Sequence, residues 1–248
     1  MQRPLTLITG GTRGIGAATA VRLAAAGHDL VLGYAHDDSA AREVSAQVHD
    51  AGAQCLTIRS DLMTDDGIDT LFEAASRHGT LTGVVNNAGA TLHIGALAET
   101  SRDVVRRTVD LNLTAALLVA RAAVRAMSTS YGGVGGVLVN VSSGAATLGS
   151  PHEYVQYAAA KAGVDAMTTG LAQEVALDGV RVVGVAPGIV RTDIHADAGE
   201  PGRIERVGPK VPLGRVGEPT EIADAIAWLM SDAASYVTGT TLRVAGGR

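Results

Sequence analysis

The chain has 248 residues, of which 46% are hydrophobic and 18% are charged, and this balance excludes a disordered protein. Its length is one that α/β folds close as a single domain. The formal net charge of −5 gives no general attraction to nucleic acid or to anionic membranes, so neither is expected as a partner.

Short apolar runs alternate with longer amphipathic runs from end to end. We expect strands at residues 4–9, 29–34, 54–58, 82–87, 136–142, 180–186 and 240–245. We expect helices at residues 14–26, 39–51, 65–78, 111–128, 155–178 and 219–231. The strands are apolar almost throughout, which is typical of a parallel sheet covered by helices on both faces. The alternation predicts a Rossmann-like, doubly wound parallel sheet of seven strands in a single α/β domain, residues 1–248.

Glycines punctuate this pattern. Gly27, Gly52, Gly79 and Gly179 each follow a helical run, where we expect a left-handed cap. Residues 187–217 are rich in glycine and proline and carry little periodicity. A segment of this kind in a compact fold is usually a lid or a binding loop, so we place a substrate lid at about residues 188–217.

The sequence TGGTRGIG, residues 9–16, joins the first predicted strand to the first predicted helix. Glycines let a backbone approach a pyrophosphate, and the N-terminus of the following helix presents free N–H groups and a positive dipole. The strand–turn–helix context therefore predicts a dinucleotide site, although the spacing G-x-x-x-G-x-G differs from the usual Rossmann one.

The stretch EYVQYAAAK, residues 153–161, holds two tyrosines and one lysine. On a helix Tyr157 and Lys161 are neighbours across one turn, whereas Tyr154 is about 10 Å from Lys161 along the axis. A nearby ammonium favours a phenolate, so we expect Lys161 to lower the pKa of Tyr157 from its usual value of about 10. Tyr154 lies outside this proton chemistry and either lines the substrate pocket or caps the helix.

Taken together, the motifs of the chain resemble those of the short-chain dehydrogenase/reductase family over nearly its whole length. The family's TGxxxGIG is matched at residues 9–16, NNAG at 86–89, the serine strand end at 140–143, YxxxK at 157–161 and the PG turn at 187–188. They occur in the family's order and at its spacings. The resemblance is nearest to bacterial β-ketoacyl-carrier-protein reductases and to glucose dehydrogenase-like members.

The resemblance implies four catalytic residues. Tyr157 is the acid in carbonyl reduction and the base in alcohol oxidation, and Lys161 also holds the nicotinamide ribose. Ser142 and Ser143 end a strand with side chains on opposite faces, so only one can face the site, and the family pattern selects Ser143 to contact the substrate oxygen. Asn112 is expected to hold a water that links Lys161 to solvent.

The resemblance also implies a nicotinamide dinucleotide, with NADP(H) favoured and NAD(H) possible. The second strand ends at Tyr34 without the carboxylate that NAD-binding sites use, and Arg13 resembles the family's partner of the 2′-phosphate. Asp37 and Asp38 are interpreted as the N-cap of the next helix. The implied cofactor contacts are Gly10, Thr12, Arg13, Gly14, Ile15, Gly16, Tyr34, Asp61, Leu62, Asn87, Ala88, Gly89, Tyr157, Lys161, Pro187, Gly188, Ile189 and Thr192.

The substrate end is less defined, and Ser143, Tyr154 and His195 are its candidate contacts. Docking of an acyl carrier protein is not supported, because Gln173 stands where the carrier-protein reductases usually have an arginine. The lid carries basic residues that could meet an anionic substrate, although we favour their solvation on a mobile loop. These residues are Arg191, Arg203, Arg206, Lys210 and Arg215.

We therefore expect an enzyme that interconverts a ketone and a secondary alcohol. The alternatives are a sugar or polyol dehydrogenase working in the oxidative direction and, more remotely, a non-catalytic dinucleotide-binding regulatory protein. The histidines lack metal-ligand spacing, so no catalytic metal is expected.

The surroundings of the protein are also constrained by its sequence. The single cysteine, Cys55, excludes an internal disulfide, and polar residues interrupt the longest uncharged run, so we expect a cytoplasmic protein without a membrane span. Apolar stripes on helices 111–128 and 155–178 predict a homotetramer.

Overall fold

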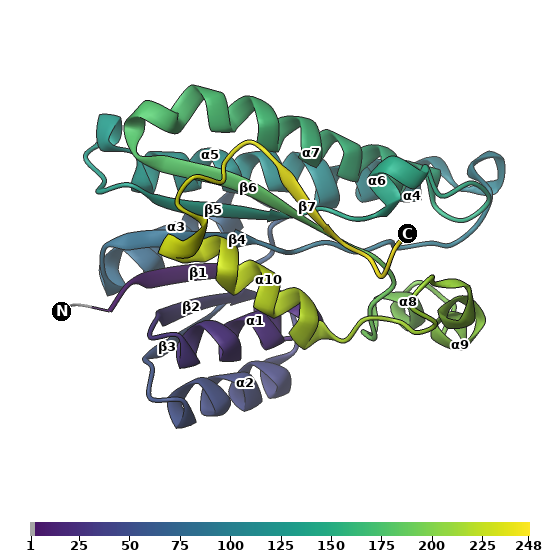
Figure 1. The fold of residues 1–248 in the computed structure, drawn as a ribbon, viewed down its shortest axis with the longest axis horizontal. Coiled ribbons are helices and arrows are strands. Elements are labelled where there is room, and N and C mark those ends of the chain that lie inside the picture. The colour runs from purple at the N-terminus through teal and green to yellow at the C-terminus, as the bar shows by residue number, and fades with distance from the viewer. Residues whose placement is uncertain (1–2) are drawn as a thin grey trace.

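A seven-stranded parallel sheet forms the centre of the molecule, with strand order β3-β2-β1-β4-β5-β6-β7 (Figure 1). The computed structural model describes residues 3–248. The strands are β1 (Leu5–Thr9), β2 (Asp29–Tyr34), β3 (Cys55–Arg59), β4 (Leu81–Asn86), β5 (Gly136–Val141), β6 (Val180–Pro187) and β7 (Thr241–Val244). All neighbouring strands pair in parallel, which confirms the predicted sheet and places each strand within one or two residues of its expected range.

Helices cover both faces of this sheet (Figure 1). The longer ones are α1 (Gly14–Ala25), α2 (Asp38–Asp50), α3 (Asp65–His78), α4 (Arg102–Val109), α5 (Ala115–Met127), α7 (Val155–Val175) and α10 (Pro219–Met230). Three short helices are α6 (Ala145–Leu148), α8 (Ile194–Asp197) and α9 (Arg203–Val207). One apolar core lies between the sheet and α1, α2 and α10, and the other lies between the sheet and α3, α5 and α7.

The apolar strands follow from this layering. In β1, Leu7 packs into the core with α3, α5 and α7, and the next residue, Ile8, packs into the core with α1, α2 and α10. Both side chains are fully buried. Because successive residues of a strand face opposite sides of the sheet, a strand that is covered on both faces is apolar at most of its positions.

One helix differs from its prediction. The segment expected to begin at residue 111 begins at Arg102, where the Ser101 hydroxyl caps α4 by accepting from Val104 N, and it runs through a π-helical turn, Asp110–Thr114, into α5. In residues 102–109 the apolar side chains of Val104, Val105 and Val109 do recur at helical spacing, but this first part is short and the prediction missed it. Such π turns inside α-helices occur frequently at functional sites.

One expectation about irregular segments also needs correction. Gly27, Gly52 and Gly179 adopt left-handed φ values of 96°, 79° and 76°, as predicted, but Gly79 has a φ of 167° and is extended. The segment 187–217 contains α8, α9 and a 3₁₀ turn, Gly208–Lys210. Its short helices follow one another too closely to produce a readable period.

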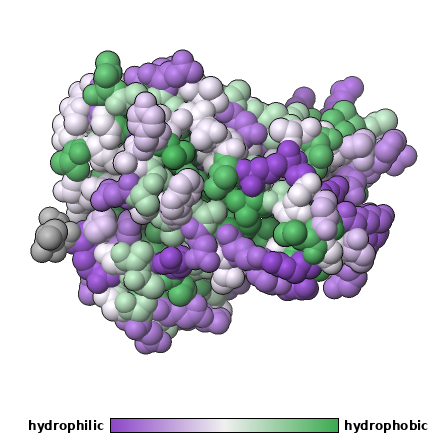
Figure 2. Space-filling view, in the orientation of Figure 1, coloured by the Kyte–Doolittle hydropathy of each residue, from purple (hydrophilic) through white to green (hydrophobic). Residues whose placement is uncertain are grey.

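The surface of the molecule mixes polar and apolar residues. Figure 2 shows hydrophilic side chains gathered around α8 and α9, the part of the fold that projects from the carboxyl end of the sheet. Within residues 3–248 no helix has the length and apolar character needed to cross a membrane. The same residues hold no cluster of three or more His, Cys, Asp or Glu side chains that could bind a metal ion.

Candidate active site

A cleft of about 740 Å³ opens at the carboxyl ends of the strands. This is the edge where ligands bind in open parallel α/β sheets. The turn after β1, the segment after β4, the end of β5, the start of α7 and the segment after β6 all line it.

Most of the predicted site residues meet in this cleft. Its walls include Gly10, Thr12, Arg13, Gly14, Ile15, Tyr34, Asp61, Asn87, Ala88, Gly89, Ser143, Tyr154, Tyr157, Lys161, Pro187, Gly188, Ile189, Thr192 and His195. Three predicted residues do not line it. Leu62 lines a small adjoining cavity beside Asp61, Gly16 is buried behind the turn, and Asn112 is fully buried beneath the cleft floor.

The turn after β1 is held in shape by Asn87. Its side-chain Nδ2 donates to Thr9 O at 2.9 Å and to Gly10 O at 3.0 Å. In the other direction, the Thr9 hydroxyl accepts from the backbone N–H groups of Asn87 and Ala88 at 2.9 and 3.0 Å. The asparagine motif after β4 therefore acts as a brace that fixes the glycine turn against the sheet.

The turn has the form of a cradle for a phosphate group. Gly10 and Gly14 have left-handed φ values of 59° and 52°, which disfavour other residues. A Cβ on Gly16 would lie 2.0 Å from Gly10 O, so only glycine lets α1 start this close to the turn. The first turn of α1 carries no acidic side chain, which leaves its positive N-terminus open to an anion. These features fit the pyrophosphate of a dinucleotide.

Tyr157 and Lys161 lie together at the inner end of the cleft. Tyr157 is 7% exposed and Lys161 is 3% exposed, and the Lys161 ammonium lies 5.7 Å from the centre of the Tyr157 ring. Lys161 Nζ donates to Val141 O at 2.9 Å, and the hydroxyl of Ser142 donates to Lys161 O at 3.2 Å. The buried Ser142 thus ties the end of β5 to α7, and both Ser142 and Ser143 line the cleft.

Burial dominates the ionisation of this pair. It raises the pKa of Tyr157 above its usual value, and hydrogen bonding with the Ser143 side chain only partly opposes this. Burial also lowers the pKa of Lys161 to about 8, with Asp165 acting in the opposite direction. The pKa of Tyr157 predicted from helix spacing is therefore wrong in direction, because spacing carries no information on how much solvent both groups lose.

Asn112 lies in the π-helical turn with no exposed surface. Its Nδ2 donates to Ala90 O at 2.8 Å and to Thr108 O at 2.9 Å, and its Oδ1 accepts from Ala90 N at 3.2 Å. A Cβ on Gly89 would lie 2.7 Å from Asn112 Oδ1 and 3.2 Å from Lys161 Nζ. Asn112 therefore braces the segment after β4 directly beneath Lys161.

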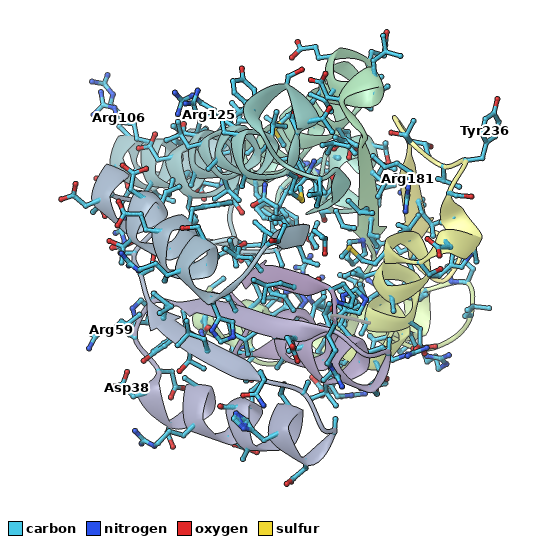
Figure 3. The ribbon with its side chains drawn as sticks, turned by 90° about the vertical axis from the view of Figure 1, so that its left-hand side faces the viewer. Asp38, Arg59, Arg106, Arg125, Arg181 and Tyr236 are labelled. Atoms are coloured by element: carbon cyan, nitrogen blue, oxygen red, sulfur yellow. The ribbon has the colours of Figure 1, made fainter. Side chains whose placement is uncertain are left out.

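The part of the cleft beside the end of β2 is more exposed than the part around Tyr157. Arg13 faces Asp197 of α8 across the cleft, with Nη2 and Oδ2 3.4 Å apart and both side chains about half exposed. The Tyr34 hydroxyl donates to Asp38 at 2.9 Å, and Asp38 lies on the outer surface at the start of α2 in Figure 3. Asp37 caps α2 by accepting from Ala40 N at 2.9 Å, which confirms its interpretation as an N-cap.

The lid arginines are paired with carboxylates. Arg191 bonds Glu218 at 3.0 Å, and Arg215 bonds Glu221 through two contacts of 2.7 Å. Arg203 is only 1% exposed and is enclosed by acidic side chains, so the expectation that the lid arginines are solvated is wrong for this residue. The partner of Arg203 is Glu153, the glutamate of EYVQY. The sequence could not predict this pair, because Glu153 and Arg203 lie in distant segments of the chain.

Tyr154 and His195 form part of the wall between the lid and Tyr157. Tyr154 is 6% exposed, and its ring meets the ring of Tyr157 edge to face, with centroids 5.5 Å apart at an angle of 87°. His195 is 7% exposed, and burial together with the charge of Arg203 lowers its pKa to about 4. His195 is consequently neutral at pH 7.

A family model described as enoyl-(acyl carrier protein) reductase matches residues 10–248. The chain is 42% identical over 245 residues to the uncharacterized oxidoreductase YgfF of Escherichia coli, covering 98% of this chain and 99% of that protein. It is 37% identical to 3beta-hydroxysteroid dehydrogenase 1 of Eggerthella lenta, covering 97% of this chain and 92% of that protein. The solved structure of a short-chain type dehydrogenase/reductase from Mycobacterium marinum matches with a TM-score of 0.91 at 31% identity, covering 98% of this chain and 94% of that one.

The two kinds of protein that the motifs resemble are also among the relatives. Glucose 1-dehydrogenase 2 of Bacillus subtilis is 35% identical, covering 97% of this chain and 93% of that protein. The 3-oxoacyl-[acyl-carrier-protein] reductase of Synechocystis sp. is 36% identical, covering 98% of this chain and 96% of that protein. The resemblance predicted from the motifs is confirmed.

Proposed function

The chain belongs to the short-chain dehydrogenase/reductase family, whose members are oxidoreductases that use a nicotinamide dinucleotide, and we propose that it interconverts a ketone and a secondary alcohol with NADP(H). The observation that carries this proposal is the buried pair at the inner end of the cleft, with Lys161 Nζ 5.7 Å from the centre of the Tyr157 ring. Ser143 lines the same end of the cleft.

In this proposal Tyr157 gives the proton that the substrate oxygen gains during reduction and takes it back during oxidation. The Ser143 hydroxyl hydrogen-bonds that oxygen while it carries charge. Since burial opposes a phenolate at Tyr157, the ammonium of Lys161 stabilises the phenolate that proton transfer leaves behind. Asn112 keeps the segment after β4 in place under Lys161. The cofactor, when bound, supplies the hydride in reduction and accepts it in oxidation.

Most of the proposed cofactor residues line the cleft. The glycine turn with Thr12 and Ile15 would hold the pyrophosphate, Lys161 the nicotinamide ribose, and Asp61 and Leu62 the adenine. The remaining contacts would come from residues 87–89 and from Pro187, Gly188, Ile189 and Thr192.

We propose NADP(H) rather than NAD(H) because of the charged side chains found near the end of β2. No carboxylate occupies the last position of this strand, which is Tyr34, and the Tyr34 hydroxyl is engaged with Asp38. Arg13 is about half exposed, and its ion pair with Asp197 is also exposed. Exposed pairs of this kind contribute only about 0–1 kcal/mol, so a phosphate can replace Asp197 at little cost.

For the substrate we propose an uncharged ketone or alcohol that contacts Ser143, Tyr154 and His195. A neutral histidine and an aromatic ring border this end of the cleft, and the arginines of the lid named above are already bonded to carboxylates. A sugar or polyol dehydrogenase acting oxidatively is the second candidate, favoured by the relative named glucose 1-dehydrogenase 2. Docking of an acyl carrier protein stays unsupported, because Gln173 is exposed and bonds within its own helix.

We also propose a cytoplasmic homotetramer assembled through α5 and α7. Leu117 and Leu118 of α5 are 45% and 36% exposed, although such side chains are usually buried. Sedimentation velocity tests this assembly, and a monomer at micromolar concentration would refute it.

The function is tested with purified protein and a panel of substrates. NADPH and NADH oxidation is followed with neutral ketones and β-ketoacyl thioesters, and reduction of both oxidised cofactors is followed with sugars and secondary alcohols. Turnover of a neutral ketone with NADPH supports the proposal, and turnover of sugars alone supports the second candidate. Tight cofactor binding without any turnover would point to a non-catalytic protein.

A further inference from the structure

Five side chains form a network between the lid and the start of α7, and we call them the arginine clamp: Glu153, Tyr154, Glu200, Arg203 and Arg206. Glu153 and Tyr154 immediately precede α7, and the other three lie on or beside α9. Fifty residues of sequence separate the two sides. The clamp is therefore a tertiary connection between the lid and the helix that carries Tyr157 and Lys161.

Arg203 is the centre of the clamp. Its two terminal nitrogens bond both oxygens of Glu153, with Nη1 at 3.1 Å and Nη2 at 2.5 Å. Nη1 also donates to Glu200 at 2.9 Å, and Nη2 also donates to the Tyr154 hydroxyl at 2.9 Å. Arg206 adds a bond of 2.6 Å to Glu200 and one of 3.3 Å to Glu153. The two arginines balance the two carboxylates, so the clamp leaves no surplus charge for a substrate.

The clamp reaches the reacting groups through Tyr154. The guanidinium carbon of Arg203 lies 5.0 Å from the centre of the Tyr154 ring, and this ring packs edge to face on Tyr157. Tyr154 and Tyr157 share a small apolar cluster with Ala145, Ala158 and Ile94. The position of the Tyr157 ring is thus set partly by a neighbour whose hydroxyl is held from the lid.

The backbone before α7 needs such an anchor. Ser150 and His152 have left-handed φ values of 45° and 62°, although neither is a glycine. Conformations of this kind cost of order 1–3 kcal/mol each and persist only where surrounding contacts hold them. The buried ion pair between Glu153 and Arg203 follows directly after this strained stretch.

We propose that Arg203 is a positioning residue of the active site, which acts through Glu153 and Tyr154 to hold the Tyr157 ring in the orientation that proton transfer requires. This rests on the function proposed above. Misplacing a reacting group by about 1 Å can cost about 100-fold in rate, so a residue that touches neither cofactor nor substrate can still control turnover. Through the same contacts, the position of α9 in the lid and the orientation of the Tyr157 ring depend on each other.

The test compares R203M, R203K and Y154F with a matched control, R181M. Arg181 of β6 is also a partly buried arginine. It donates to Leu229 O of α10 and to Val237 O, and it has no bond to the arginine clamp. Figure 3 labels its position. Folding is checked by thermal melting, NADPH affinity by fluorescence titration, and the backbone of residues 150–158 by hydrogen exchange.

For R203M we expect kcat to fall about 10- to 100-fold while the Kd for NADPH changes less than threefold. Hydrogen exchange of residues 150–158 should become faster. R203K keeps the charge but loses the paired bonds to Glu153, so it should recover only part of kcat. R181M loses its bonds to backbone carbonyls, so it is expected to lower the melting temperature but to leave kcat and the exchange of residues 150–158 unchanged.

Equal kcat in R203M and wild type, or equal losses in R203M and R181M, would overturn the proposal. If R203M does not fold, Y154F decides the matter, because it removes only the hydroxyl that Arg203 holds. A lower kcat together with faster hydrogen exchange of residues 150–158, at unchanged NADPH affinity, supports the proposal, whereas full activity or unchanged exchange overturns it. If the wild type reduces no carbonyl, the function proposed above fails. Hydrogen exchange still tests the coupling in that case, and unchanged protection of residues 150–158 in R203M would refute it.

Discussion

The ammonium of Lys161 lies 5.7 Å from the centre of the Tyr157 ring, and both side chains are more than nine-tenths buried. Burial makes the neutral form of each group more favourable, raising the pKa of Tyr157 and lowering that of Lys161. The Ser143 side chain partly opposes the rise at Tyr157, and Asp165 partly opposes the fall at Lys161. The burial of these two groups is the basis of the first two predictions.

Replacing Tyr157 with phenylalanine removes the proposed proton donor and little else. General acid–base catalysis contributes about 10²- to 10⁴-fold, so we expect kcat of Y157F to fall by about that factor. Cofactor affinity should stay within a few-fold of wild type. Steady-state kinetics with the best ketone, together with NADPH titration, measures both. A Y157F protein with nearly full activity would refute the proposed mechanism.

Lys161 is expected to reduce stability at neutral pH. Its pKa is about 8 in the folded protein, against a usual value of 10.5, so the unfolded chain binds more protons between these values. Stability from this group therefore rises as pH increases through that window. At 1.36 kcal/mol per pKa unit, keeping Lys161 charged in the folded protein at pH 7 lowers the free energy of unfolding by about 3 kcal/mol.

The variant K161M removes this titration. We expect the free energy of unfolding of K161M, minus that of wild type, to be larger at pH 7 than at pH 10, because the variant escapes the cost of the buried charge at pH 7. Urea denaturation at the two pH values measures the difference, and groups that titrate in both proteins cancel. A difference that does not change with pH would contradict the burial of a charged Lys161.

Arg13 is expected to select NADPH. Hydrogen bonds to charged groups contribute about 1.5–3 kcal/mol, so R13A should lose about 10- to 100-fold in NADPH affinity. NADH affinity should change little. A suitable control is R22A, because Arg22 pairs with Asp224 at 2.7 Å between α1 and α10. If R13A binds both cofactors as wild type does, the NADP(H) proposal loses its main support.

Gly16 is expected to be irreplaceable in the phosphate turn. A methyl group there would lie 2.0 Å from Gly10 O, so the turn or α1 must move in G16A. Overpacking costs about 1–3 kcal/mol, and we expect cofactor affinity to fall at least about tenfold. In α7, Gly170 has no atom within 4 Å of an added Cβ, so G170A should bind normally and gain stability. Isothermal titration of both variants with NADPH measures the cofactor affinity, and equal affinities in G16A and G170A would contradict this prediction.

The arginine clamp is expected to weaken in acid. Burial alone would raise the pKa of Glu153, but the hydrogen bonds and charges of Arg203 and Arg206 hold it below its usual 4.5. A carboxylate with a lowered pKa contributes stability that is fully present above the unfolded value and is lost as pH falls through the folded one. Proteolysis of the lid should therefore accelerate below about pH 4.5 in wild type, and much less so in R203M. Identical pH profiles in the two proteins would argue against the clamp.

Much of this architecture was readable from local pattern. The order of strands and helices follows from runs such as LTLIT and from glycines such as Gly27 and Gly179, because both report on nearby backbone. The candidate site residues were found by their spacing within motifs, and most of them meet in one cleft. Helix α4 was missed although Val104, Val105 and Val109 recur at helical spacing, because so short a helix gives only a weak periodic signal.

The sequence by itself determined the fold class, the family and many of the residues that line the cleft, because strand periodicity and motif spacing are local properties. Only the tertiary structure decided the protonation of Tyr157 and Lys161, and only it joined Arg203 to Glu153, fifty positions earlier in the chain. Desolvation and long-range ion pairs depend on every atom packed around a group. That packing exists only once distant segments have come together.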